Sequence, residues 1–231
     1  MKRWAFALLA IGIMGCQEKK PEHTEVNLED KVHKRSYGIG MDIANMLKQQ
    51  GIEVNIEVFM QGFKDRYKDE ATLMNQEEIN KTLAELQQEK MAEQQASQDK
   101  ISEDNKTKGA AFLAENKNKE GVVTLASGLQ YKVITQGSGP KPKNTDEVTF
   151  HYKGTLMDGT VFDESYGRGQ PATLRVDQLI PGWIEALQLM PVGSKWELYV
   201  PGMLAYGARP GGPGGPNSTL IFQVELLNIK K

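Results

Sequence analysis

The pattern of apolar and polar positions changes near residue 120, and it predicts two regions of different architecture. Before this point, apolar residues recur every three or four positions, which is the spacing of amphipathic helices. After it, apolar and polar residues alternate in short runs separated by turns, which is typical of antiparallel strands. We therefore predict a helical region over residues 31–120 and an α+β domain over residues 121–231.

Two short helices are predicted at the start of the helical region. The second has an apolar stripe within residues 56–63. The first ends before Gly51, a typical helix C-cap, and its stripe consists of Ile39, Ile43, Met46 and Leu47. Neither helix can bury its stripe alone. We expect the stripes to pack against each other or against a second copy of the chain, and we predict a homodimerisation module.

A long connecting helix is predicted from Asn75 to about residue 117. Asn75 and Glu78 match a capping box. Residues 87–108 are almost entirely polar, which fits either a solvent-exposed helix or a disordered, charge-rich linker. The absence of proline between residues 71 and 139 and the many strong helix formers favour the helix. It would be about 60 Å long at 1.5 Å per residue, and it would form a solvated arm between the two regions.

In the second region, alternation predicts strands over residues 129–134, 148–152, 196–200 and 220–226. Asp158-Gly159 predicts a hairpin turn, and residues 182–189 form the only good helical pattern in this region. Several antiparallel strands and one short helix indicate that the helix packs against a curved sheet.

The first sixteen residues belong to neither region. Lys2 and Arg3 precede an uncharged apolar run over residues 4–14, which is too short to span a bilayer and has the length of a signal-peptide core. Residues 13–16, Ile-Met-Gly-Cys, resemble a lipobox. We predict a signal peptide over residues 1–15, and a lipidated Cys16 that begins a flexible tether over residues 16–30. The alternative is an ordinary signal sequence with a leftover thiol.

This anchor predicts a location in the bacterial cell envelope, at the outer membrane and facing the periplasm or the cell surface. Composition excludes other functions. With 28 basic and 30 acidic residues, the chain has no one-sided basic field for nucleic acid. Cys16 is the only cysteine, and His23, His33 and His151 do not form a ligand cluster. Neither a metal nor a cofactor is expected.

Five ordered sequence blocks in the second region carry a close resemblance to a known family. They are HYKGTLMDGTVFDES (151–165), LIPGW (179–183), VG (192–193), VPGMLAYG (200–207) and PNSTLIFQVELL (216–227). Together they resemble the signature of FKBP-type peptidyl-prolyl cis-trans isomerases. The helical region is similar to that of the bacterial envelope subgroup, the macrophage infectivity potentiator-like proteins. The resemblance covers nearly the whole mature chain.

The resemblance implies a proline pocket and assigns its residues. Trp183 would form the floor, and Asp163 would polarise the site near the rotating carbonyl. Arg168 would position Asp163 and Tyr152. The remaining assignments are Tyr152, Tyr206 and Phe162 as catalytic residues beside Asp163, and Leu179, Ile180, Phe222 and Ala205 as substrate-binding residues. Pattern alone leaves another interpretation open, because alternating aromatics are usually core residues, and Asp163 and Tyr206 could be ordinary loop residues.

Isomerisation needs neither a nucleophile nor a metal, because only amide resonance must be broken, against a barrier of about 18–20 kcal/mol. We predict an isomerase that acts on proline-containing unfolded polypeptides, also works as an ATP-independent chaperone, and binds macrolide inhibitors by resemblance. The first alternative is a chaperone or binding lipoprotein that keeps the fold but has little activity. A purely structural helical lipoprotein is the second.

Overall fold

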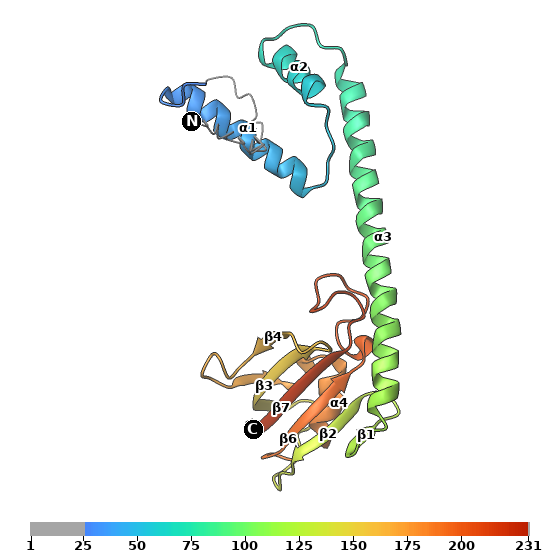
Figure 1. The fold of residues 1–231 in the computed structure, drawn as a ribbon. Coiled ribbons are helices and arrows are strands. Elements are labelled where there is room, and N and C mark those ends of the chain that lie inside the picture. Colours follow the sequence, from blue (N-terminus) through green and yellow to red (C-terminus); the bar gives the residue numbers. More distant parts are fainter. Residues whose placement is uncertain (1–25, 231) are drawn as a thin grey trace, which may run out of the picture. The chain divides into compact units, whose positions relative to one another are not determined.

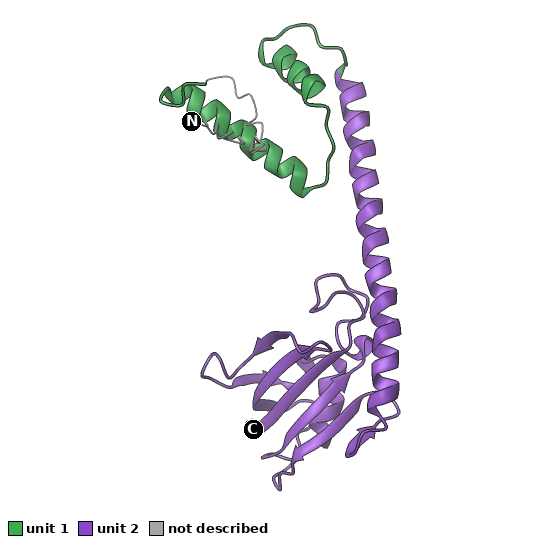
Figure 2. Cartoon of the chain, in the orientation of Figure 1, with its two compact units in different colours: residues 1–75 green, residues 76–231 purple. Residues whose placement is uncertain are grey.

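The computed structural model describes residues 26–230 (Figure 1). The predicted signal peptide, the lipobox with Cys16 and the first part of the tether lie outside the described residues. The chain divides into two compact units, with the boundary between Asn75 and Gln76 (Figure 2). No helix within residues 26–230 has both the length and the apolar content needed to cross a membrane.

The first unit contains two short helices, α1 (Lys31–Gln49) and α2 (Ile56–Tyr67). Asp30 caps the start of α1 by accepting hydrogen bonds from the N–H groups of the first turn. Gly51 ends it with φ at +62°, and the next N–H, from Ile52, bonds back to Leu47 O at 2.9 Å. This is the glycine-terminated ending that the sequence predicts.

Helix α3 (Gln76–Asn116) is continuous over 41 residues, which confirms the helix rather than the disordered linker. Its last turns are not a free arm, however, because they pack on the sheet that follows. The Phe112 ring lies 6.1 Å from the Tyr199 ring, and Gln130 Nε2 donates to Leu113 O at 2.9 Å. Phe112 and Leu113 both lie beyond the polar stretch 87–108 that the sequence predicts to be solvated. Within that stretch the prediction is wrong at Ser102 and Asn105, which form hydrogen bonds with residues 214–218.

The sheet has the strand order β1-β2-β6-β7-β3-β4, and β5 pairs with β3 beside β4. All pairings are antiparallel, as predicted. The strands are β1 (Val122–Thr124), β2 (Gln130–Thr135), β3 (Glu147–Leu156), β4 (Val161–Glu164), β5 (Ala172–Arg175), β6 (Lys195–Val200) and β7 (Leu220–Lys230). Strands β1 and β5 were not predicted. Neither were two short 3-10 helices, η1 (Val176–Gln178) and η2 (Gly202–Leu204).

Helix α4 (Pro181–Leu189) packs on one face of the sheet and completes the predicted α+β fold (Figure 1). Its buried residues Trp183, Ala186 and Leu187 join the core. The alternation predicted for strands β3 and β7 is confirmed, because one face of each is buried. These core positions are Val148 and Phe150 on β3, and Leu220, Phe222, Val224 and Leu226 on β7.

Candidate active site

A cavity of about 280 Å³ opens between α4 and the sheet. Its lining is mainly aromatic and aliphatic, with one carboxylate. The lining residues are Phe150, Tyr152, Phe162, Asp163, Leu174, Gln178, Leu179, Ile180, Trp183, Tyr206 and Phe222. Such a lining suits a small apolar group that is held by few polar contacts.

Trp183, in the first turn of α4, packs edge-on against three aromatic rings of the cavity. The ring centroids of Phe150, Tyr152 and Phe222 lie 5.1, 5.7 and 5.2 Å from it. Only 4% of Trp183 is exposed, so the indole is held in one orientation by its neighbours. The alternation of β3 and β7 thus places rings from both strands around one helical side chain.

Gly154 on β3 lets the cavity rings approach the backbone closely. It pairs across the sheet with Phe222. A Cβ at this position would lie 2.6 Å from Phe162 Cζ and 3.0 Å from Phe222 Cε1. Only glycine leaves room for the edge-to-face pair of these rings, whose centroids are 5.7 Å apart.

The polar side of the cavity is a network of three side chains. Tyr152 Oη donates to Asp163 Oδ2 at 2.5 Å. Arg168 donates to both, from Nη1 to Asp163 Oδ1 at 2.6 Å and from Nη2 to Tyr152 Oη at 2.7 Å. The hydrogen bond from Tyr152 and the guanidinium of Arg168 lower the pKa of Asp163, which is therefore ionised at neutral pH. Burial and the bond to Asp163 raise the pKa of Tyr152.

The structure brings most of the predicted site residues together around this cavity, with two exceptions. Arg168 does not line the cavity but contacts two residues that do. Ala205 is buried beside Tyr206 and is also outside the lining. Ile180 is the N-cap of α4, and its carbonyl accepts from the N–H groups of Trp183 and Ile184. The role of each residue in catalysis stays a prediction.

Sequence reasoning missed three lining residues, Phe150, Leu174 and Gln178. Phe150 lies on the same face of β3 as Tyr152, so the alternation pattern could have identified it. Leu174 and Gln178 come from β5 and η1, which are too short to give a periodic signal. His151 points away from this site, since its Nδ1 lies 2.9 Å from Ser165 Oγ and its ring stacks on Tyr166.

A helix packed on an antiparallel sheet, with an aromatic-floored cavity and a carboxylate at its side, defines a domain of the FKBP type. Two family models match the chain. "Domain amino terminal to FKBP-type peptidyl-prolyl isomerase" matches residues 32–133, and "FKBP-type peptidyl-prolyl cis-trans isomerase" matches residues 139–227.

Relatives agree with these matches. The outer membrane protein MIP of Legionella longbeachae is 50% identical over 86% of this chain and 85% of its own length. The peptidyl-prolyl cis-trans isomerase Mip of Coxiella burnetii is 41% identical over the full length of both chains. The crystal structure of FkpA from Escherichia coli is 37% identical, with a TM-score of 0.72, over 87% of this chain and 98% of that one. The chain belongs to the FKBP-type peptidyl-prolyl cis-trans isomerases, which confirms the predicted family, fold and enzyme class.

Proposed function

We propose that the cavity above Trp183 is the active site, and that it accelerates rotation about X–Pro bonds in polypeptides of the cell envelope. The observation that carries this proposal is an apolar cavity with one ionised carboxylate, Asp163, at its polar side. A proline ring fits such a lining. The amide before it would then lie beside Asp163 and Tyr206.

The mechanism needs no covalent step. As the amide twists, it loses resonance and becomes less dipolar, so a water-poor apolar cavity binds the twisted form better than the planar form. Each tenfold gain in rate needs only about 1.4 kcal/mol of this preference. We expect the Tyr206 hydroxyl and the Ile180 N–H to hold substrate carbonyl oxygens during the rotation.

Asp163 would act on the rotating carbonyl through its negative charge. A carboxylate acts reproducibly only if its orientation is fixed, and two donors fix it here: Tyr152 Oη and Arg168 Nη1. Arg168 also bonds Tyr152, so the three side chains form a closed set. We infer that Arg168 is a positioning residue rather than a substrate ligand.

The test is a proline-limited refolding assay with protein from residue 17 onward. Acceleration of the slow refolding phase at substoichiometric enzyme supports the enzyme. The rival, a chaperone that keeps the fold but has little activity, predicts no acceleration together with suppressed aggregation of an unfolded client. A macrolide that competes with a proline-containing peptide would place both ligands in the same cavity.

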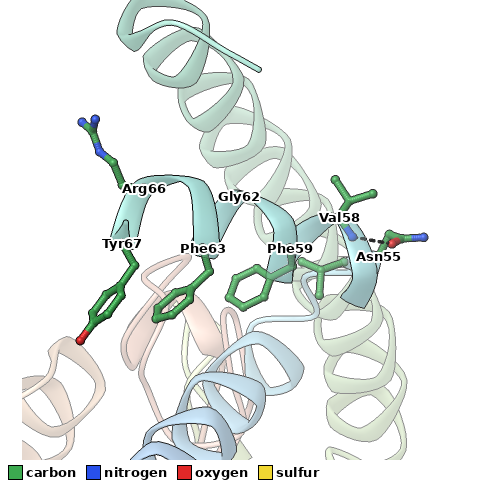
Figure 3. A pocket seen from close by; sticks show the side chains of 8 residues that line it. Asn55, Val58, Phe59, Gly62, Phe63, Arg66 and Tyr67 are labelled. Carbon is green, nitrogen blue, oxygen red and sulfur yellow. Dashed lines mark hydrogen bonds between the residues drawn. The ribbon is translucent and has the colours of Figure 1, made fainter. Parts of the chain in front are cut away.

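We further propose that the first unit forms a homodimer through α2. A groove of about 810 Å³ runs along α2. The rings of Phe59, Phe63 and Tyr67 line this groove and lie on one side of the helix (Figure 3). These side chains are too exposed for a monomer surface: Phe63 is 48% and Tyr67 79% exposed.

The helix glycines support a second copy as the occupant of this groove. Apart from the backbone of their own helix turns and their chain neighbours, Gly38 and Gly40 on α1 and Gly62 on α2 have no atom within 4 Å of the position a Cβ would take. Glycine inside a helix costs about 1 kcal/mol relative to alanine, and nothing within the described chain compensates for it. Close approach of a partner helix would explain all three.

Replacing Phe59 and Phe63 together by serine is expected to convert the dimer into a monomer. Light scattering on residues 17–231 should give twice the chain mass for wild type and one chain mass for the double variant. Met203→Ser is a suitable control, because this residue is exposed on the other unit. A wild-type monomer, or a double variant that stays dimeric, would contradict this interface.

The predicted anchor and location stay proposals. The Legionella relative is described as an outer membrane protein, which supports an envelope location. We propose that Cys16 carries the lipid that holds the chain there. Cell fractionation should then find wild type with the membranes and Cys16→Ser in the soluble fraction.

A further inference from the structure

The loop that connects η2 to β7, residues 206–219, is fastened to α3. Asn105 Nδ2 lies 2.9 Å from Gly214 O, 2.9 Å from Pro216 O and 3.0 Å from Ser218 Oγ. Three acceptors thus surround one amide group that carries two hydrogens. Figure 1 shows this loop beside α3.

Neighbouring turns of α3 add to this attachment. Ser102 Oγ accepts a hydrogen bond from Asn217 Nδ2 at 2.7 Å. One turn beyond Asn105, a Cβ on Gly109 would lie 2.3 Å from Thr219 Oγ1, so this glycine allows the helix to approach the loop. Residues three or four apart share a helix face, so Ser102, Asn105 and Gly109 form one continuous contact surface.

The loop needs external contacts to hold one conformation. Residues 209–216 read RPGGPGGP, and Gly211, Gly214 and Gly215 have φ between +72° and +92°. Glycine loses more conformational entropy on ordering than any other residue. Asn217 also adopts a positive φ of +55°, which is uncommon for a residue with a side chain.

The fastened loop reaches the candidate active site through Tyr206. Asn217 N–H donates to Gly207 O at 2.7 Å, which joins the two ends of the loop. Gly212 packs on Tyr206, because a Cβ there would lie 3.1 Å from Tyr206 Cβ. Tyr206 lines the cavity, whereas no residue of α3 is among the lining residues of the described chain.

We propose that Asn105 is a positioning residue for the isomerase reaction, acting from α3 through the 206–219 loop to hold Tyr206 at the cavity. This role rests on the proposed function of the Tyr206 hydroxyl. The catalytic rate then depends on α3, although none of the described residues of α3 lines the cavity.

The experiment measures kcat and KM of the chain from residue 17 onward on an X–Pro tetrapeptide. Asn105→Ala is expected to lower kcat/KM about tenfold, because misplacing a group by about 1 Å can cost up to ~100-fold. Asn105→Asp keeps nearly the same shape but replaces the donating amide by a carboxylate. Because its oxygens can only accept, they would face the three acceptors of the loop, so this variant should lose at least as much activity as Asn105→Ala. Asn80→Ala, the same change nearer the start of α3, is the control and should match wild type.

A double-mutant cycle separates positioning from a general loss of stability. If Asn105 acts through the Tyr206 hydroxyl, Asn105→Ala should have little further effect in a Tyr206→Phe background. The unfolding midpoint of each variant should lie well above the assay temperature. If Asn105→Ala does not meet this condition, Ser102→Ala takes its place, because it also removes a hydrogen bond between α3 and the loop.

Wild-type kcat/KM in Asn105→Ala, or an equal tenfold loss in the Tyr206→Phe background, would overturn the proposal while the isomerase function stands. An inactive wild type would instead contradict the isomerase function itself, and this role of Asn105 with it.

Discussion

Replacement of Asp163 by leucine is expected to lower kcat/KM on an X–Pro tetrapeptide by about 10- to 100-fold. Interactions with a charged group contribute about 1.5–3 kcal/mol each, and every 1.4 kcal/mol corresponds to a factor of ten. The fold should survive, since the Asp163 side chain is 44% exposed and leucine can occupy its place. Initial rates and the unfolding midpoint, measured on the same sample, check both statements.

Glu147→Leu provides the matched control for a paired carboxylate. Glu147 lies on β3, forms an ion pair with Lys230 at 3.4 Å, and is outside the cavity lining. Its loss should leave kcat/KM unchanged. If Asp163→Leu were as active as Glu147→Leu, the carboxylate would have no part in the reaction, and the site assignment would fail.

The pH dependence follows from the same network. The pKa of Asp163 lies below its ordinary 3.8, so the ionised form and its bonds to Tyr152 and Arg168 are lost only as pH falls below that value. The pKa of Tyr152 lies above 10.0, so its proton, and the bond it makes, are lost only as pH rises above that value. Wild-type activity should therefore be flat between about pH 5 and 9.

Periodicity predicted the long elements correctly and missed the short ones for a physical reason. Strand β7 and helix α3 are long enough that burial of one face, or a run of strong helix formers, leaves a clear pattern. Strands β1 and β5 have three and four residues, which cannot establish a period. They are held by pairing with β2 and β3, and that pairing is not visible in the local sequence.

The site was predictable as a set of residues but not as a geometry. Alternation places Tyr152 on the buried face of β3, yet it cannot say whether the ring is core or cavity wall. That distinction depends on β3, β7 and α4 meeting at Trp183, and on Phe162 of β4 packing against Phe222. The resemblance to FKBP-type isomerases supplied what the pattern lacked.

The contact between α3 and the 206–219 loop had no signal in the sequence. Asn105 and Pro216 are more than a hundred residues apart, and Asn105 lies within a polar stretch that the sequence assigns to a solvated arm. Its amide bonds loop carbonyls, and Ile101, whose Cγ2 would lie 2.9 Å from a Cβ on Gly215, is an isolated apolar residue of this contact that forms no stripe. A polar contact between residues this far apart in the sequence can be identified only once the fold is known. An apolar stripe, in contrast, can be recognised in the sequence itself.

Replacing Trp183 by alanine should have the largest effect on stability and also abolish activity. Truncation of a buried Trp costs about 3–5 kcal/mol of unfolding free energy. Trp183 contacts Phe150, Tyr152 and Phe222, so its loss also leaves three cavity rings without their common support. Urea unfolding should show the lower stability, and kcat/KM per folded molecule should fall to background.

Trp196→Ala separates the two effects, because Trp196 is equally buried at 4% exposure but lies outside the cavity lining. It stacks on Tyr131 with centroids 4.3 Å apart, so its truncation should cost a similar free energy of unfolding. Its folded molecules should keep most of their activity. If both variants lost activity in proportion to stability, Trp183 would be an ordinary core residue. Activity lost in Trp183→Ala alone would mean that the same indole supports the core and binds the substrate.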